Sequence, residues 1–223
     1  VKQVAKVGGT KDFDLKKIRV LEPTHLIVNI DENPRELVEA AGRFVPHVIV
    51  THPMGPLDNI ALYRLLGAIF DRVQEADELA KRFEVAYQEA CDVTCHLPHE
   101  RVLYIIWKNP WMTISRDTYI ARTLAAIGWD QIEIDSASRY PEIEIESLLN
   151  EVDRVLLSSE PYAFRPRDVA EVAAMTGRRD VPAVSLIDAE MTSWYGSRAI
   201  AGMCYLAHTR RDGAARAQGI SGD

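Results

Sequence analysis

The sequence predicts an α/β fold made of two parallel-sheet lobes that a long backbone helix joins. Short apolar runs of strand length alternate with segments that carry apolar residues at helical spacing, as in parallel sheets covered by helices. One helical segment near the middle of the chain is much longer than the others. We expect an N-terminal lobe over residues 1–56, a connecting helix over 57–96, a C-terminal lobe over 97–210 and a flexible tail over 211–223.

The first half contains two strands, and each is bounded by helical segments. Asp14–Leu21 has the amphipathic pattern of a short helix, which Pro23 ends before a strand over Leu26–Val28. A helix over Pro34–Ala41 follows, and the second strand is Val48–Val50. Both strands run into loops that contain proline and polar residues, so the order of strand, loop and helix repeats.

The long helical segment begins near Leu57 and continues to about Cys95. Its apolar residues recur at three- and four-residue spacing over a length far beyond that of an average helix. We expect one helix here, with a bend near Asp71, that separates the two α/β halves.

The second half repeats the alternation of strands and helices, which predicts a parallel sheet. The expected strands are Val102–Trp107, Ile132–Ile134, Val155–Leu157 and Ala183–Ile187. The expected helices are Asp117–Ile127, Glu144–Asn150, Arg167–Met175 and Ser197–Thr209. The residues from Arg211 onward are rich in Gly, Ala, Arg and Ser without a hydrophobic period, which is the reason for expecting a mobile tail.

Composition argues against several classes of protein. The 223 residues are 47% hydrophobic and 26% charged, which is ample for a buried core. A net charge of −7 with scattered basic residues argues against a nucleic-acid partner. No apolar run is long enough to cross a bilayer, and the first residues lack the apolar stretch of a signal peptide. Because Val1 stands where a start methionine is usual, we expect further residues upstream.

The cysteine content leaves the redox compartment open. Three cysteines cannot all pair within one chain, and disulfide-stapled secreted domains use many more. Cys91 and Cys95 lie near a helix end, and His96 and His99 follow them in a spacing that faintly resembles a metal cluster. Without a paired CxxC or a carboxylate, free thiols are the favoured interpretation, and we expect neither a bound metal nor a cofactor.

Aromatic residues gather at the ends of the predicted strands of the second half. The strand Val102–Trp107 stops at a loop that contains Pro110 and Trp111, Tyr162 follows the third strand, and Trp194 follows the last. The carboxyl ends of parallel strands meet at one edge of a sheet, where open α/β sheets bind ligands. Aromatic rings there predict a pocket, and similar loops on both lobes predict a ligand cleft between them. Packing within the loops is the alternative for each ring.

Polar side chains at the strand ends are candidates for ligand contacts. Asn29, Glu32 and His52 follow the two strands of the first half, and Glu160 follows a strand of the second half. His52 has the chemistry to bind iron or cobalt, or to donate a hydrogen bond. Each group also has a structural alternative, since a turn histidine caps backbone groups and acidic residues cap the helix that begins at Pro34.

Two segments resemble a known family. Residues 7–28, VGGTKDFDLKKIRVLEPTHLIV, are similar to a V-G-x-…-D-L-E-K-I-x-A-L-x-P-D-L-V-I segment of helical-backbone (class III) substrate-binding proteins of ABC importers. Residues 109–118, NPWMTISRDT, are similar to the start of the second lobe in the cobalamin-binding branch. The resemblance extends from Val7 to about Thr209. It implies two lobes on a helical backbone, and a non-enzymatic receptor that delivers cobalamin, ferric siderophores or haem.

The resemblance also implies a ligand and partners. It favours a metal-chelate ligand, a corrinoid such as cobalamin, and a periplasmic or surface-anchored monomer that binds the permease subunits of an ABC importer. In the cobalamin receptor, aromatic residues stand at the positions of Asn29 and Met191, so the strand-end tryptophans would supply aromatic surface here. The expected ligand-binding residues are Asn29, Glu32, His52, Trp107, Trp111, Glu160, Tyr162, Met191 and Trp194.

Members of the family dock acidic residues of both lobes onto arginines of the transporter. Arg35 stands at the matching first-lobe position, so Glu36 or Glu39 would substitute for it, and Glu190 is the second-lobe candidate. Ordinary solvated helix surface is the alternative for these carboxylates. The family also has an earlier strand and helix without an equivalent in this sequence, which implies a missing N-terminal segment or a reduced first lobe.

Alternative functions stay open at this point. A ferric siderophore or haem is the alternative ligand, since converging basic residues would favour a siderophore and an axial Tyr or His would favour haem. A cytosolic sensor or an enzyme subunit that reuses the fold is the alternative role. We do not expect an enzyme, because the chain has no G-x-S-x-G, H-E-x-x-H or G-x-x-x-x-G-K-[ST] motif.

Overall fold

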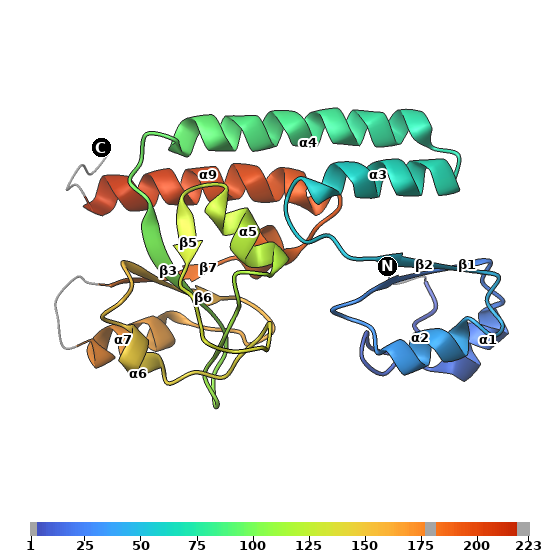
Figure 1. The fold of residues 1–223 in the computed structure, drawn as a ribbon, viewed down its shortest axis with the longest axis horizontal. Coiled ribbons are helices and arrows are strands. Elements are labelled where there is room, and N and C mark those ends of the chain that lie inside the picture. The colour runs from blue at the N-terminus through green and yellow to red at the C-terminus, as the bar shows by residue number, and fades with distance from the viewer. Residues whose placement is uncertain (1–3, 177–181, 218–223) are drawn as a thin grey trace. The chain divides into compact units, whose positions relative to one another are not determined.

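The computed structural model describes residues 4–176 and 182–217. The chain folds into two compact units, of which unit 1 ends at His52 and unit 2 begins at Pro53 (Figure 1). Unit 1 therefore ends close to the lobe boundary predicted at residue 56. The segment predicted as a separate connector, residues 57–96, belongs to unit 2.

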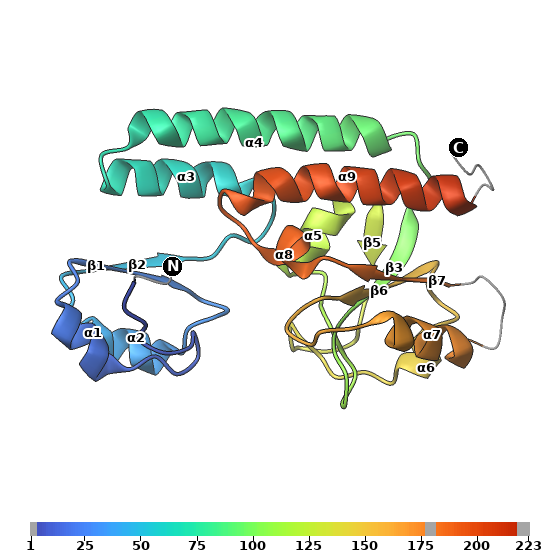
Figure 2. The ribbon, with the colours of Figure 1, turned by 180° about the vertical axis from the view of Figure 1, so that it is seen from behind.

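Unit 1 is a two-stranded parallel sheet with two helices on one face (Figures 1 and 2). Its elements are α1 (Leu15–Leu21), β1 (His25–Asn29), α2 (Arg35–Ala41) and β2 (His47–Thr51). The register places Val28 of β1 beside Val50 of β2. A small buried cluster between helices and sheet contains Phe13, Ile18, Ala41 and Val45. The strands and helices predicted for the first half are present.

The prediction of one helix over residues 57–96 is wrong, because this segment forms two helices. Helix α3 spans Asp58–Ile69 and α4 spans Val73–Thr94, and they pack side by side in opposite directions (Figures 1 and 2). The chain reverses at Asp71, where a left-handed φ of 53° interrupts the helical conformation. The sequence predicted a bend at this same residue.

Close contact between α3 and α4 explains how the chain reverses there. An added Cβ at Gly67 of α3 would overlap the side chain of Ala76 in α4, so only glycine allows this approach. The N–H of Arg72 donates to the Gly67 carbonyl at 2.7 Å and closes the turn. Apolar residues of both helices face the same core, and this shared face made two helices resemble one in the sequence.

Unit 2 is built around β3 (Glu100–Trp107). Along one side, β3 is parallel to β6 (Arg154–Ser158), which is in turn parallel to β7 (Ala183–Ile187). Along the other side, β3 pairs with the parallel strand β5 (Trp129–Gln131) near its start and with the antiparallel strand β4 (Met112–Thr113) near its end. The expected parallel sheet is present, with one short antiparallel strand added.

The strand expected over Ile132–Ile134 is displaced to β5, which ends at Gln131. Trp129 is drawn into the core at 1% exposure, and the Gln131 side chain accepts a hydrogen bond from the N–H of Tyr104 at 3.0 Å. These contacts place the residues that pair with β3 earlier in the chain than Ile132 and Ile134, on which the prediction was based. Strand β4 was not predicted, because two residues carry no periodic signal.

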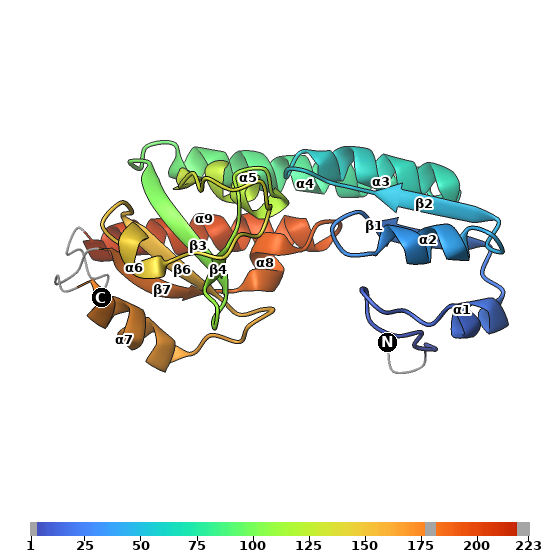
Figure 3. The same cartoon turned by 60° about the horizontal axis from the view of Figure 1, so that its bottom comes forward.

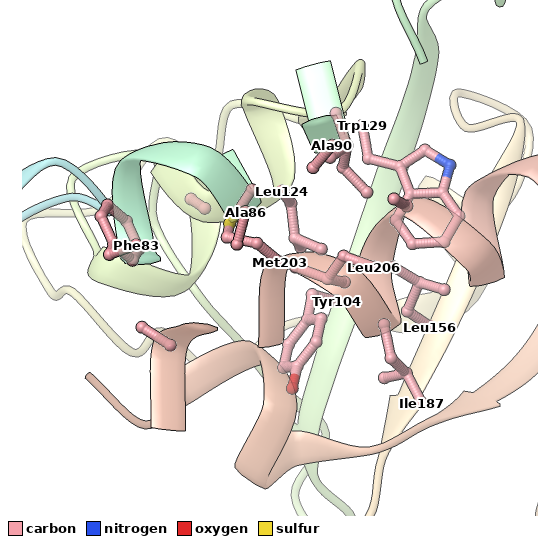
Figure 4. Packing of buried hydrophobic residues seen from close by; sticks show 14 of the residues in the cluster. Phe83, Ala86, Ala90, Tyr104, Leu124, Trp129, Leu156, Ile187, Met203 and Leu206 are labelled. Atoms are coloured by element: carbon pink, nitrogen blue, oxygen red, sulfur yellow. The ribbon is translucent and has the colours of Figure 1, made fainter. Parts of the chain in front are cut away.

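Helices cover both faces of this sheet. On one face, Tyr104 and Leu156 pack against α4, α5 (Tyr119–Ala125) and α9 (Arg198–Ala217), as Figure 4 shows for Met203 and Leu206 of α9. On the other face, Leu103 and its neighbours pack against α6 (Ile145–Leu148) and α7 (Pro166–Met175) (Figure 3). Residues 102–105 of β3 are at most 1% exposed. This burial explains the nearly continuous apolar run, which is typical of parallel strands covered on both faces.

The flexible tail predicted over residues 211–223 is wrong in its first part. Helix α9 continues through Ala217, and its residues Arg210 and Ala214 are 0% and 8% exposed. Packing of this face holds the helix together although its residues are small and polar. Residues 218–223 lie outside the described part of the chain. Within the described ranges, no helix combines the length and the apolar character that crossing a membrane requires.

A carboxylate at the amino end of the sheet binds two buried arginines. Glu100 accepts hydrogen bonds from Arg154 at 2.7 Å, from Arg210 at 2.7 Å and from the indole N–H of Trp129 at 2.9 Å. Both guanidinium groups lie over the Trp129 ring. Burial raises the pKa of Glu100, but the arginines and the indole outweigh burial and hold this pKa below its ordinary value. Glu100 thus joins β3, β6 and α9.

We predict that Glu100→Gln lowers the free energy of unfolding by about 3 kcal/mol at pH 7, because two buried guanidinium groups lose their counter-charge. Since the folded pKa of Glu100 is lowered, its contribution is present above the ordinary value of 4.5 and is lost as pH falls through the folded pKa. Urea unfolding at pH 7 and at steps below pH 4.5 measures both effects. Glu89→Gln on the exposed surface of α4 is the control, and equal stability of the two variants would refute the prediction.

A second prediction concerns the contact between α9 and the short helix α8 (Ala189–Ser193). An added Cβ at the buried Gly202 would overlap the carbonyl oxygen of Met191, so Gly202→Ala has to push α8 away from α9. We expect a loss of about 2 kcal/mol in the free energy of unfolding. At Gly55, an added Cβ would make ordinary contacts of 3.5 and 3.6 Å with Arg122. Gly55→Ala should therefore unfold within about 0.5 kcal/mol of the wild type in the same urea experiment.

Candidate functional site

Three loops of unit 2 meet at the carboxyl edge of its parallel sheet. They follow β3, β6 and β7, and backbone hydrogen bonds join them, including one of 3.0 Å from the N–H of Ser159 to the carbonyl of Ile187. The end of β3, the loops after β3 and β6, and the residue that follows α8 carry five aromatic side chains, which we call the aromatic edge: Trp107, Trp111, Tyr162, Phe164 and Trp194. The structure therefore places on one sheet edge the rings that the sequence predicted at separate strand ends.

Four rings of the aromatic edge touch one another. Trp107 meets Tyr162 edge-to-face with ring centroids 5.7 Å apart, and Tyr162 lies 4.6 Å from Phe164. Trp111 stacks on Phe164 with centroids 6.1 Å apart and an angle of 4° between the rings. Such pairs are stabilising beyond the area they bury, so the rings form one rigid surface.

A buried ion pair supports Trp111. The ammonium group of Lys108 lies 5.4 Å from the centre of the Trp111 ring, and it binds Asp168 at 3.1 Å and Glu171 at 2.5 Å. The hydrogen bond to Glu171 raises the pKa of Lys108. Burial raises the pKa of Asp168, but the N–H of Arg165 and the ammonium of Lys108 outweigh burial and lower it. Both groups are therefore charged at neutral pH, and the pair joins the β3 loop to α7.

Trp194 is held by polar contacts. Its indole N–H donates to a carboxylate oxygen of Glu160 at 2.6 Å. The guanidinium of Arg198 lies over the ring at 5.6 Å from its centre and binds Glu190 at 3.0 Å. Glu190, the candidate for transporter docking, is thus part of the support of an aromatic residue.

The tryptophans differ in how much ring surface they offer. Trp107 is 38% exposed and Trp194 is 48% exposed, whereas Trp129 at the opposite end of the sheet is 1% exposed. Trp111 is half-buried and packs against the core of unit 2, so loop packing accounts for much of its environment. Trp107 and Trp194 are therefore the strongest candidates for contact with a ligand.

The candidate residues of unit 1 lie at the carboxyl ends of β1 and β2. Asn29 is 7% exposed; its amide donates to the carbonyl of Thr51 at 3.1 Å and its oxygen accepts from the N–H of Asp31 at 2.8 Å. These contacts form a turn. Glu32 is exposed and accepts a hydrogen bond from Thr10 at 3.2 Å. His52 is half-buried, and its Nε2 lies 3.5 Å from the carboxylate of Asp31.

The remaining predicted residues lie on helices. Met191 is half-buried in α8, where its N–H donates to Asp188 at 3.4 Å. Glu36 is exposed in the first turn of α2, and Arg35 beside it pairs with Glu39 at 2.7 Å. Two pairs important for the aromatic edge, Lys108 with Asp168 and Arg198 with Trp194, were not predicted. The lysine between Trp107 and Trp111 was a signal for the first pair, but its partners lie far along the chain.

The cysteine and histidine run near the end of α4 has ordinary contacts. The structure records the three cysteines as free thiols, and His99 pairs with Asp130 at 2.7 Å. Burial raises the pKa of Cys91, which keeps this thiol protonated at neutral pH. In the described part of the chain, no cluster of three or more His, Cys, Asp or Glu residues is arranged to hold a metal ion.

Comparison with known proteins places the fold. No family model and no curated protein sequence matches the chain. The solved structure of the periplasmic heme-binding protein RhuT from Roseiflexus sp. RS-1 is similar, with a TM-score of 0.77 and 20% identity over 96% of this chain and 85% of that one. The periplasmic vitamin B12-binding protein BtuF of Vibrio cholerae has a TM-score of 0.74 and 18% identity over 96% and 83%. The chain has the helical-backbone substrate-binding fold.

Another similar structure is a periplasmic heme-binding protein from Pseudomonas aeruginosa, with a TM-score of 0.78 and 16% identity over 96% of this chain and 81% of that one. The fold class expected from the sequence is confirmed by these similarities. In the helical-backbone substrate-binding fold of this chain, the aromatic edge lies at the carboxyl ends of parallel strands, where open α/β sheets bind ligands.

We predict that Lys108→Met lowers the free energy of unfolding by roughly 2 kcal/mol, because the Asp168 side chain, 2% exposed, loses its cation. Lys81→Met on the exposed face of α4 is the control and should change little. Adding Asp168→Asn to Lys108→Met should recover part of the loss, since the unpaired charge is then removed. Urea unfolding of the single and double variants measures the coupling, and strictly additive effects would contradict it.

Proposed function

We propose that this protein is the solute-binding protein of an ABC importer and captures a large metal-chelate ligand against the aromatic edge. The observation that carries the proposal is the pair Trp107 and Trp194, two tryptophans that remain 38% and 48% exposed at the carboxyl edge of a parallel sheet. An exposed indole in a fixed position is suited to stack on a flat, partly apolar ligand. The mechanism is reversible binding, without bond-making chemistry.

A corrinoid such as cobalamin is the ligand that we favour. Each cation that lies over a tryptophan of the aromatic edge is already neutralised, Lys108 by Asp168 and Glu171 and Arg198 by Glu190. This local balance offers little attraction to an anionic chelate. A corrinoid has a periphery of uncharged carboxamides and carries its own axial ligands, so it needs neither a basic pocket nor a protein ligand to the metal.

Haem is the second candidate, because of one feature of unit 1. The imidazole of His52 lies 3.5 Å from the carboxylate of Asp31, and a carboxylate beside a histidine orients the ring for metal binding. A half-buried histidine at a strand end has the chemistry of an axial haem ligand. Among the solved proteins with this fold, two of those named above are heme-binding proteins and one binds vitamin B12. A ferric siderophore is a further alternative of the same class.

The partners follow from the same proposal. The protein would act as a monomer in the periplasm or at the cell surface and pass its ligand to importer permease subunits. Glu36, exposed in the first turn of α2, is the carboxylate that we propose for docking in unit 1, and Glu190 is the counterpart in unit 2. A cytosolic sensor that reuses the fold would bind the same ligand without stimulating importer ATPase activity.

Isothermal titration against cyanocobalamin, cobinamide, haem and a ferric hydroxamate tests the proposal. We expect micromolar or tighter binding of one of these ligands, and a loss of about tenfold in affinity for Trp107→Ala and for Trp194→Ala. Val85→Ala, an exposed apolar truncation on α4, is the control and should bind as the wild type does. The proposal fails if the folded protein binds none of the panel, or if the tryptophan variants bind as tightly as the control.

A further inference from the structure

In the described part of the chain, only one of the two carboxylate oxygens of Glu160 is used in a hydrogen bond at the aromatic edge. One carboxylate oxygen accepts the indole N–H of Trp194 at 2.6 Å. The other oxygen has no hydrogen-bond partner among the described residues, and the side chain is only half-buried. A charged acceptor thus lies directly beside the most exposed tryptophan of the edge.

The backbone around Trp194 is fixed by the core of unit 2. Two residues before it, the Thr192 hydroxyl is 2.7 Å from the Tyr104 hydroxyl inside the core. Two residues after it, Gly196 accepts from the Tyr63 hydroxyl at 2.8 Å and donates to Asn59 at 2.6 Å. The core therefore fixes the position of the Trp194 backbone, and the hydrogen bond to Glu160 fixes the orientation of its ring.

The backbone that carries Glu160 is held by the loop itself. The Ser158 hydroxyl donates to the carbonyl of Glu160 at 2.8 Å, and the neighbouring Ser159 hydroxyl accepts the N–H of Ala189 at 2.9 Å. The second of these bonds joins the loop after β6 to the start of α8. These bonds fix the backbone from which the Glu160 side chain extends, and the indole N–H of Trp194 orients the carboxylate.

We propose that Glu160 is the specificity-determining residue of the aromatic edge, which positions Trp194 with one oxygen and selects chelates bearing amide N–H donors with the other. This inference rests on the proposed function. A carboxylate accepts hydrogen bonds from carboxamide groups, such as those around a corrinoid ring, and repels ligand carboxylates, such as the propionates of haem. Stacking alone does not discriminate between these flat chelates, whereas a fixed negative charge beside the stacking face does.

Two substitutions separate the two roles of Glu160. Glu160→Gln keeps an acceptor for the Trp194 indole but removes the charge, and Glu160→Ala removes both. Glu151→Gln, an exposed residue before β6 at the amino end of the sheet, makes the same change in charge away from the edge and is the control. Each variant is titrated with cobinamide and with haem.

The expected results differ for the two variants. Glu160→Ala should weaken cobinamide binding about three- to tenfold, the range that one hydrogen bond supports, because the Trp194 ring is released. For haem, loss of the repulsion between carboxylates opposes this effect, so the loss should be smaller. Glu160→Gln should shift the ratio of cobinamide to haem affinity about tenfold toward haem, while Glu151→Gln leaves the ratio unchanged. An unchanged ratio in Glu160→Gln overturns the selectivity, even where the wild type binds well.

An NMR measurement tests the positioning role without any ligand. The indole N–H signal of Trp194, identified by its loss in Trp194→Phe, should move and exchange faster with solvent in Glu160→Ala but stay near its place in Glu160→Gln. An unmoved signal in Glu160→Ala overturns the positioning role. Absence of binding by the wild type would overturn the proposed function and the selectivity together, whereas binding with an unmoved signal and an unchanged ratio overturns this inference alone.

Discussion

Burial of β3 on both faces is the constraint on which unit 2 depends. Leu103 and Ile105 face one layer of helices, Val102 and Tyr104 face the other, and none of the four is more than 1% exposed. A strand covered this way has room for polar and charged groups only at its ends. The chemistry of the unit is therefore confined to two edges of the sheet, and these edges are built differently.

A buried network of charged groups covers the amino edge of the sheet, whereas partly exposed aromatic rings cover the carboxyl edge. At the amino edge, Glu100 gathers Arg154, Arg210 and the indole of Trp129 into a buried network that joins two strands to α9. At the carboxyl edge, the paired cations Lys108 and Arg198 lie over the rings of Trp111 and Trp194, and indole surface of Trp107 and Trp194 stays exposed. Breaking a buried charge network is costly, so the amino edge stabilises the fold, whereas the carboxyl edge keeps tryptophan surface accessible to solvent.

The sequence predicted the sheets and the aromatic edge because both depend on local patterns. The apolar run ending at Trp107 was visible in the chain, and so was the placement of Trp194 after the last strand. A bend near Asp71 was predicted, but the full reversal of the chain there was not, since the apolar spacing continues across it. The contacts of Lys108 and Glu160 were equally hidden, because their partners lie on other elements and only the folded chain brings them together.

The polar contacts that hold the exposed tryptophans are a stronger indication of function than the presence of the rings alone. A tryptophan that stabilises a fold is buried, as Trp129 is, and gains its free energy from the area removed from water. Trp194 gains only part of this at 48% exposure, and in addition a carboxylate holds its N–H and an ion pair lies over its ring. Holding the exposed ring in one orientation costs conformational entropy in the free protein. Under the proposed function, a ligand that covers the ring meets a surface already in position, which loses less freedom on binding.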